Sequence, residues 1–135
     1  MKDGAIVTSE RKNDMHRRLV IDVYENVLKP LDASRVDEYF APDYVQHNPV
    51  IRTGAEGLKE FLRWAKSVSP SAEHIIKRVF VDGDFVIAHV HVIVQPGELG
   101  CAVIDIFRIE NGRIAEHWDV AQQVPRQMQN DNGMF

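Results

Sequence analysis

The spacing of apolar residues changes halfway along the chain. Between Asp14 and Pro30, apolar side chains recur every three or four residues, which predicts an amphipathic helix that ends at Pro30. Its apolar positions are Met15, Leu19, Val20, Val23, Val27 and Leu28. After Pro70 the period is two, which predicts strands. The chain therefore places its helices first and its strands afterwards.

Two shorter helices are predicted between these regions. Residues 33–40 form one, capped by Asp32 or Ser34, and it ends before Pro42 because a residue preceding proline avoids the helical conformation. The second begins at Thr53 and Glu56, which have the spacing of a capping box. Its apolar face follows at Leu58, Phe61, Leu62 and Ala65, and it ends near Ser67.

Three turn signals divide the second half into four strands. They are DGD at 82–84, QPGELG at 95–100 and ENGR at 110–113. Helices followed by hairpin-linked strands predict an α+β fold, with N-terminal helices packed on one face of a strongly curved antiparallel sheet.

Length and charge limit the domain organisation and the partners. The chain has 135 residues, enough for one domain, here residues 14–125. Residues 1–13 are expected to be a flexible tail, and residues 126–135 a tail that is either disordered or docked through Met134 and Phe135. Sixteen scattered basic and twenty acidic residues give a net charge of −4, which argues against nucleic acid and membrane as partners.

The single cysteine limits the compartment and the chemistry. Cys101 cannot form an internal disulfide, and no Cys/His spacing of a zinc site is present, so we expect a cytoplasmic protein without a metal site. The sequence also lacks a nucleophile elbow and a glycine-rich phosphate loop, which excludes serine hydrolases and nucleotide-binding enzymes of those types.

The Asn111-Gly112 turn predicts which residues lie opposite each other in the last hairpin, because this dipeptide favours a two-residue turn. Glu110 then faces Arg113. One sheet face is predicted to carry the pairs Ile109–Ile114, Phe107–Glu116, Asp105–Trp118 and Val103–Val120. The other face carries Ile106–His117 and Ile104–Asp119.

Closure of the QPGELG loop about Gly97-Glu98 would place His91 opposite Asp105 and His89 opposite Phe107. A one-residue bulge in that loop would reverse this assignment. On the first assignment, Asp105 and His91 share a largely apolar face with Glu116 and Trp118. Such a face is typical of an apolar pocket with a few polar groups, although a structural hydrogen bond between His91 and Asp105 is the alternative.

Further polar residues lie outside this face. His47 and Asn48, with Tyr44 just before them, fall in the extended segment DYVQHNP, where they can reach over the open mouth of a curved sheet. His117 and Asp119 are predicted on the opposite face. There they form either a second acid/base pair or charges at a dimer interface, and we favour the interface.

Four strings together, DYVQHNP, DGDFVIAHVHV, VIDIFRIENGRIAEHWDVAQQVP and NDNGMF, resemble the SnoaL-like branch of the NTF2-like superfamily. The resemblance covers nearly the whole chain. It implies a cone of helices against a curved sheet that encloses a pocket, and a homodimer. It also implies cofactor-independent general acid/base chemistry, such as aldol-type cyclisation, on a small hydrophobic or carbonyl-containing molecule.

The expected acid of that family falls a few residues after the last strand's Trp, but four residues after Trp118 this chain has Gln122. We therefore expect Asp105 to be the base, with His91 and His47 as its partners. Expected substrate contacts are Trp118, Phe107, His89, Glu116, Tyr44, Asn48, His117 and Asp119. The alternatives are a non-catalytic small-molecule-binding or dimerising module and, less favoured, hydrolysis by water that Asp105 activates.

Overall fold

The computed structural model describes residues 2–135, with side chains from residue 8 onward. Its elements are α1 (Lys2–Val23), a π-helical turn (Tyr24–Leu28), a 3-10 turn (Ala33–Arg35), α2 (Val36–Tyr39), β1 (Phe40–Gln46), α3 (Gly54–Val68), β2 (Glu73–Asp82), β3 (Phe85–Ile93), β4 (Cys101–Glu110) and β5 (Arg113–Gln123). No helix in the described part is long and apolar enough to span a membrane.

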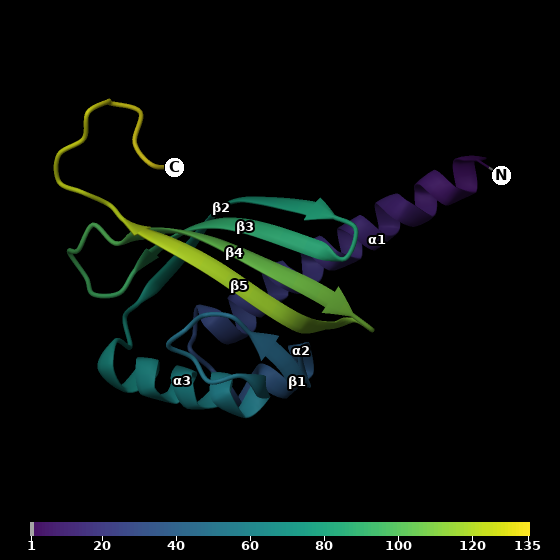
Figure 1. The fold of residues 1–135 in the computed structure, drawn as a ribbon, viewed down its shortest axis with the longest axis horizontal. Helices are drawn as coiled ribbons and strands as arrows, with labels where there is room; N and C mark the ends of the chain where they lie inside the picture. Colours follow the sequence, from purple (N-terminus) through teal and green to yellow (C-terminus); the bar gives the residue numbers. More distant parts are fainter. Residues whose placement is uncertain (1) are drawn as a thin grey trace.

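The five strands form one sheet in the order β1-β5-β4-β3-β2. β1 runs parallel to β5, and the other neighbours are antiparallel. Figure 1 shows α3 beneath the strands, near β1 and α2, and the N-terminal part of α1 extending past the sheet. The α+β fold, with helices on a curved and mostly antiparallel sheet, is confirmed.

The face of the sheet that packs against the helices is called the inner face here, and the opposite one the outer face. Val86, Ala88 and Val90 of β3 and Phe107 of β4 are buried on the inner face. Buried residues from the helical elements, Val20, Val23, Tyr24 and Leu62 among them, complete the same core. Burial of these apolar side chains is the main stabilising contribution to the fold.

The helices differ from the predicted ones in two details. α1 begins at Lys2 rather than at Asp14, so the described part of the segment expected to be a tail is helical; Met1 lies outside the described residues. Thr53 occupies the N-cap position of α3 but makes no capping bond. Its hydroxyl instead accepts a hydrogen bond from the Gln46 backbone N–H (3.1 Å) and lies 3.3 Å from the Tyr44 carbonyl oxygen.

β1 was predicted only as an extended segment after the short helix. Its strand pairing depends on β5, which lies about seventy residues later in the chain: Val45 pairs with Glu116 and Gln46 with His117. A parallel partner so distant leaves no local signal comparable to a hairpin turn.

A bulge in β5 moves the predicted register by one residue. Glu110 faces Arg113 and Ile109 faces Ile114, as predicted, but Arg108 then faces Glu116, so Ala115 is the extra residue. Beyond it the pairs are Phe107–His117, Ile106–Trp118, Asp105–Asp119, Ile104–Val120 and Val103–Ala121. The predicted pairs beyond Ile109–Ile114 were therefore wrong, and the faces of the last strand are exchanged.

The register between β3 and β4 was also predicted wrongly. Asp105 faces Ala88, and Phe107 faces Val86, rather than His91 and His89. The connection is wider than a tight turn because pairing already ends at Val92–Cys101. Two glycines of this loop, Gly97 and Gly100, have φ of +88° and +78°, a conformation that other residues rarely adopt. Both histidines consequently lie on the outer face.

The C-terminal residue lies against these histidines. The ring centroid of Phe135 is 4.3 Å from that of His91 and 5.5 Å from that of His89, and Lys77 Nζ lies 5.2 Å from the Phe135 ring. Figure 1 shows the yellow C-terminal segment leaving β5 and turning back. The Phe135 ring is thus packed against the outer face of the sheet.

Candidate functional site

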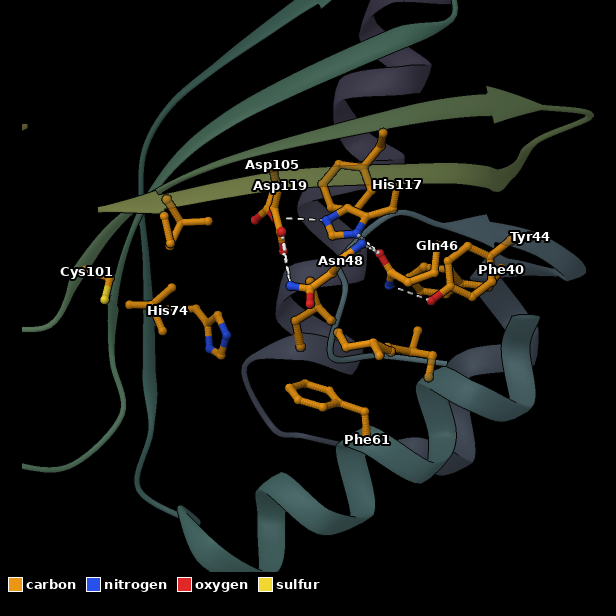
Figure 2. Close-up of a pocket in the computed structure, with 17 residues that line it drawn as sticks. Phe40, Tyr44, Gln46, Asn48, Phe61, His74, Cys101, Asp105, His117 and Asp119 are labelled. Atoms are coloured by element: carbon orange, nitrogen blue, oxygen red, sulfur yellow. Dashed lines mark hydrogen bonds and ion pairs between the residues drawn. The ribbon is translucent and has the colours of Figure 1, made fainter. Parts of the chain in front are cut away.

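A cavity of 290 Å³ lies between the inner face of the sheet and the helices. Its apolar wall includes Leu28, Phe40, Leu58, Phe61, Val92 and Val103. Its polar lining consists of Tyr44, Gln46, Asn48, His74, Asp105, His117 and Asp119, together with the thiol of Cys101. Figure 2 shows most of these polar side chains gathered around His117, with His74 and Cys101 apart from them.

Alternation along two neighbouring strands builds the polar cluster. Gln46 and Asn48, at and just after the end of β1, bond to His117 and Asp119 of β5. The parallel pairing of β1 and β5 holds these residues side by side, and a backbone hydrogen bond from His47 N–H to the His117 carbonyl (3.0 Å) extends it. The residues between them, one on each chain segment, face outward.

Gln46 determines which nitrogen of His117 carries a proton. The Asn48 backbone N–H donates to Gln46 Oε1 (3.0 Å), and Gln46 Nε2 donates to the Tyr44 hydroxyl (2.9 Å), which together orient the amide. Oε1 therefore faces His117 Nδ1 at 2.7 Å as an acceptor, so Nδ1 must be the N–H donor. The other nitrogen, Nε2, is left to exchange a proton with its own neighbour.

That neighbour is Asp105, a residue that is only 8% exposed. Its Oδ1 lies 2.9 Å from His117 Nε2, and its Oδ2 accepts a hydrogen bond from the Tyr24 hydroxyl. Because Nδ1 already holds a proton, the contact between Nε2 and Oδ1 requires one more proton shared by the two groups. Asp105 and His117 thus form a pair that can give up or take back one proton.

Tyr24 reaches Asp105 from the π-helical turn that follows α1. The turn is marked by hydrogen bonds from Lys29 N–H to the Tyr24 carbonyl (2.8 Å) and from Asp32 N–H to the Val27 carbonyl (2.9 Å). Such turns inside helices are frequent at functional sites. Burial raises the pKa of Tyr24 well above its ordinary value, and the charge of Asp105 raises it further, so the hydroxyl remains a donor.

Asp119 is the second carboxylate of the cavity. Asn48 Nδ2 donates to both of its oxygens, at 3.0 and 2.8 Å. The Asn48 amide is itself oriented, because its Oδ1 accepts from the Val50 backbone N–H (3.0 Å). Asp119 is therefore held by one neutral donor, whereas Asp105 has a separate partner on each oxygen.

Asp105, His117 and Asp119 are also the described residues that could hold a metal ion, since their ligand atoms all lie within 4.8 Å of one another. These atoms are engaged in the hydrogen bonds with Tyr24, Asn48 and each other. A cation would have to replace those bonds.

Six of the predicted site residues line the cavity: Tyr44, Asn48, Asp105, Phe107, His117 and Asp119. Five do not: His47, His89, His91, Glu116 and Trp118. The bulge explains this division for β5, because it turns His117 and Asp119 inward and Trp118 and Glu116 outward. The preference for an interface role of His117 and Asp119 was therefore wrong.

His47 and His91 do not contact Asp105. His47 Nε2 lies 2.7 Å from Glu116 Oε2, and its ring stacks on Trp118 with centroids 4.8 Å apart. Hydrogen bonds from His47 and Arg108 lower the pKa of Glu116. His91 Nε2 instead lies 2.7 Å from the Leu99 carbonyl.

Three residues of the site were not predicted from the sequence: Tyr24, Gln46 and His74. Tyr24 lies among the apolar residues of a helical pattern, so nothing distinguishes it from the core. Gln46 and His74 could have been found only with the register of β1 and β2. The strings QHN and HWD do carry a signal, because alternating polar residues on two paired strands point to the same side.

We expect Tyr24→Phe to destabilise the protein and to weaken the site. The change removes the donor to Asp105 Oδ2 without altering the shape of the side chain, and an unsatisfied buried acceptor costs roughly 1–3 kcal/mol. Urea denaturation measures this cost. Tyr39→Phe is the matched control, since the Tyr39 hydroxyl accepts a partly buried hydrogen bond from Asn26 and touches no carboxylate. Equal costs for the two variants would contradict a special role of the Tyr24–Asp105 bond.

Comparison with known proteins gives one family and many similar folds. The family model described as a SnoaL-like domain matches residues 20–117. No curated protein gives a significant match.

Solved structures share the fold at low sequence identity. A candidate polyketide cyclase from Acidithiobacillus ferrooxidans is 17% identical, with a TM-score of 0.67 over 79% of this chain and 87% of that one. TsrD from Streptomyces laurentii is 24% identical, with a TM-score of 0.62 over 80% and 86%. A candidate isomerase of the SnoaL-like family from Agrobacterium tumefaciens is 14% identical, with a TM-score of 0.65 over 83% and 98%.

Proposed function

Since the chain belongs to the SnoaL-like domain family, we propose that it is an enzyme that removes a proton next to a carbonyl group of a small apolar molecule, without a cofactor. The observation that carries this proposal is the convergence of Asp105, His117 and Asp119 in one largely apolar cavity. An enolate or enol formed in this way is the intermediate of an isomerisation or an aldol-type ring closure.

The two carboxyl groups have different surroundings, which suits them to different roles. Among the described residues, only the neutral amide of Asn48 donates hydrogen bonds to Asp119, which acts as the base. Asp105 shares a proton with His117, and this pair acts as the acid. A base and an acid within 4.8 Å of each other can serve a carbon and the oxygen of an adjacent carbonyl at once.

Proton transfer then balances within the site. The C–H bond next to the carbonyl breaks, its proton moves to Asp119, and its electron pair forms the new C=C bond. The carbonyl oxygen takes the proton shared by Asp105 and His117, which leaves a neutral enol, an ionised Asp105 and a neutral His117. Attack of the enol carbon on a second carbonyl, or return of the proton to another carbon, restores the starting protonation state.

These roles revise the expected ones. Asp105 remains a catalytic residue, but His117 replaces His91 and His47 as its partner. Phe107, Tyr44 and Asn48 remain expected contacts or supports of the substrate, because they line the cavity. Trp118, Glu116 and His89 are excluded from this role by their position on the outer face.

Hydrogen–deuterium exchange tests the reaction without knowledge of the natural substrate. We expect the protein to accelerate exchange of the protons next to the carbonyl of 2-tetralone in deuterated buffer by at least about tenfold over buffer alone. Proton NMR follows the loss of these signals. Binding of 2-tetralone without acceleration would instead favour the non-catalytic small-molecule-binding module.

The homodimer expected from the resemblance stays a prediction. The outer face carries the apolar residues Ile104, Ile106 and Val120, and the Val120 side chain is 68% exposed. A second copy packed there would cover them.

A further inference from the structure

His74 is a polar side chain of the cavity that the proposed reaction does not use. It lies on β2 opposite Val92, and it lines the cavity together with Cys101. Figure 2 shows its imidazole directed into the cavity, apart from the hydrogen bonds that join Asp105, His117 and Gln46.

This imidazole has an unsatisfied nitrogen. Its Nδ1 is buried and has no hydrogen-bond partner among the described residues. Buried polar groups in folded proteins are nearly always bonded, and leaving one unsatisfied costs stability. A leucine would fill the same space without that cost, so retaining a histidine here requires another explanation than packing.

We propose that His74 binds a second oxygen of the substrate, so that the substrate is an apolar molecule with two oxygen functions, one at the Asp105–His117–Asp119 cluster and one at His74. This inference rests on the proposed function for the first oxygen. The apolar residues between the two polar ends, Val92, Val103 and Phe61 among them, contact the carbon skeleton.

The charge state of His74 indicates the kind of oxygen. Burial lowers the pKa of His74, and the positive charge of Lys29 lowers it further, while the charge of Asp105 raises it. His74 is therefore neutral at pH 7, with one donor and one acceptor nitrogen. A hydroxyl or carbonyl oxygen of the substrate fits this group. A carboxylate on the substrate would instead be repelled by Asp105 and Asp119.

Two aromatic alcohols of similar shape test the second binding position. 2-Naphthol has one hydroxyl, and 2,6-dihydroxynaphthalene has one at each end. In calorimetric titrations of the wild-type protein we expect the diol to bind about tenfold more tightly, which corresponds to one additional hydrogen bond. In His74→Leu the preference should fall to about the statistical factor of two for a ligand with identical ends, while His74→Gln should retain part of it.

Stability gives a readout that does not depend on any ligand. We expect His74→Leu to raise the Tm by about 3 °C, because an unsatisfied polar group is replaced by an apolar one of similar size. The pKa of His74 is lower in the folded protein than in the unfolded chain, so the unfolded chain binds a proton more readily. The wild-type protein therefore loses stability as the pH falls below about 6.5. The gain from His74→Leu should therefore grow at acid pH.

The outcomes separate the two proposals. An unchanged diol preference in His74→Leu, with 2-naphthol still bound, would overturn the role of His74 and leave the acid/base site intact. Failure of both alcohols to bind the wild-type protein would overturn the inference, together with the proposal that the cavity binds a small apolar molecule. If the wild-type protein prefers the diol but does not accelerate proton exchange on 2-tetralone, only the proposed reaction would be overturned.

Discussion

Asp105→Asn should abolish proton exchange on 2-tetralone while leaving the fold intact. The asparagine is isosteric, its amide N–H can donate to His117 Nε2, and its carbonyl oxygen can accept from Tyr24. Every hydrogen bond of the pair is therefore replaced, but the exchangeable proton is gone. We expect the exchange rate to fall to that of buffer alone, because a general acid ordinarily contributes about 100-fold or more.

The fold and the chemistry are measured separately in this variant. The free energy of unfolding should change by less than about 1 kcal/mol, because no buried group loses its partner. Asp119→Asn should lose the same activity, since it removes the base. Retention of the wild-type exchange rate in both variants would show that neither carboxylate takes part.

Glu116→Gln is the matched control for this experiment. Glu116 is another carboxylate of β5 that contacts a histidine, since its Oε2 lies 2.7 Å from His47 Nε2. It lies on the outer face, away from the cavity. The variant should exchange protons at a rate within about twofold of wild type. A large loss here would mean that the charge of β5 as a whole, and not the cavity, supports the reaction.

The fold could be predicted from the sequence because its signals are local. The turn at Asn111-Gly112 fixes the pairing of Glu110 with Arg113, and the turn at residues 82–84 fixes the pairing of Asp82 with Phe85. The helical periodicity of α3 predicts its buried face at Leu58 and Leu62. The family strings lead to the same architecture.

The site could be predicted only in part because it depends on non-local register. Asp105 was predicted and lines the cavity, but its contact with His117 was not predicted, since a single extra residue at Ala115 changes which side chains of β5 face inward. Tyr24 was missed for another reason. An aromatic residue in an apolar helical pattern gives no sign that its hydroxyl reaches a carboxylate until the helix is placed on the sheet.

Deletion of Ala115 should remove the bulge and keep the site. Without the extra residue, Glu116 follows Ile114 directly, so regular pairing gives Arg108–Glu116, Phe107–His117 and Asp105–Asp119, the same pairs as in the structure. His117 and Asp119 would still face the cavity, and Asp105 would keep its partner. We expect proton exchange to be retained, with a loss of stability of roughly 0.5–3 kcal/mol, the ordinary range for a change in a packed region.

Urea denaturation and the exchange rate together decide this prediction. Ala115→Gly keeps the chain length and should retain the bulge, with a loss below about 1.5 kcal/mol and near-normal proton exchange, because only one methyl group is removed. A deletion variant that lost proton exchange would mean that the bulge itself, and not only the pairing beyond it, holds His117 and Asp119 toward the cavity. Retained exchange would show that their inward orientation depends on which residue of β5 pairs with Phe107.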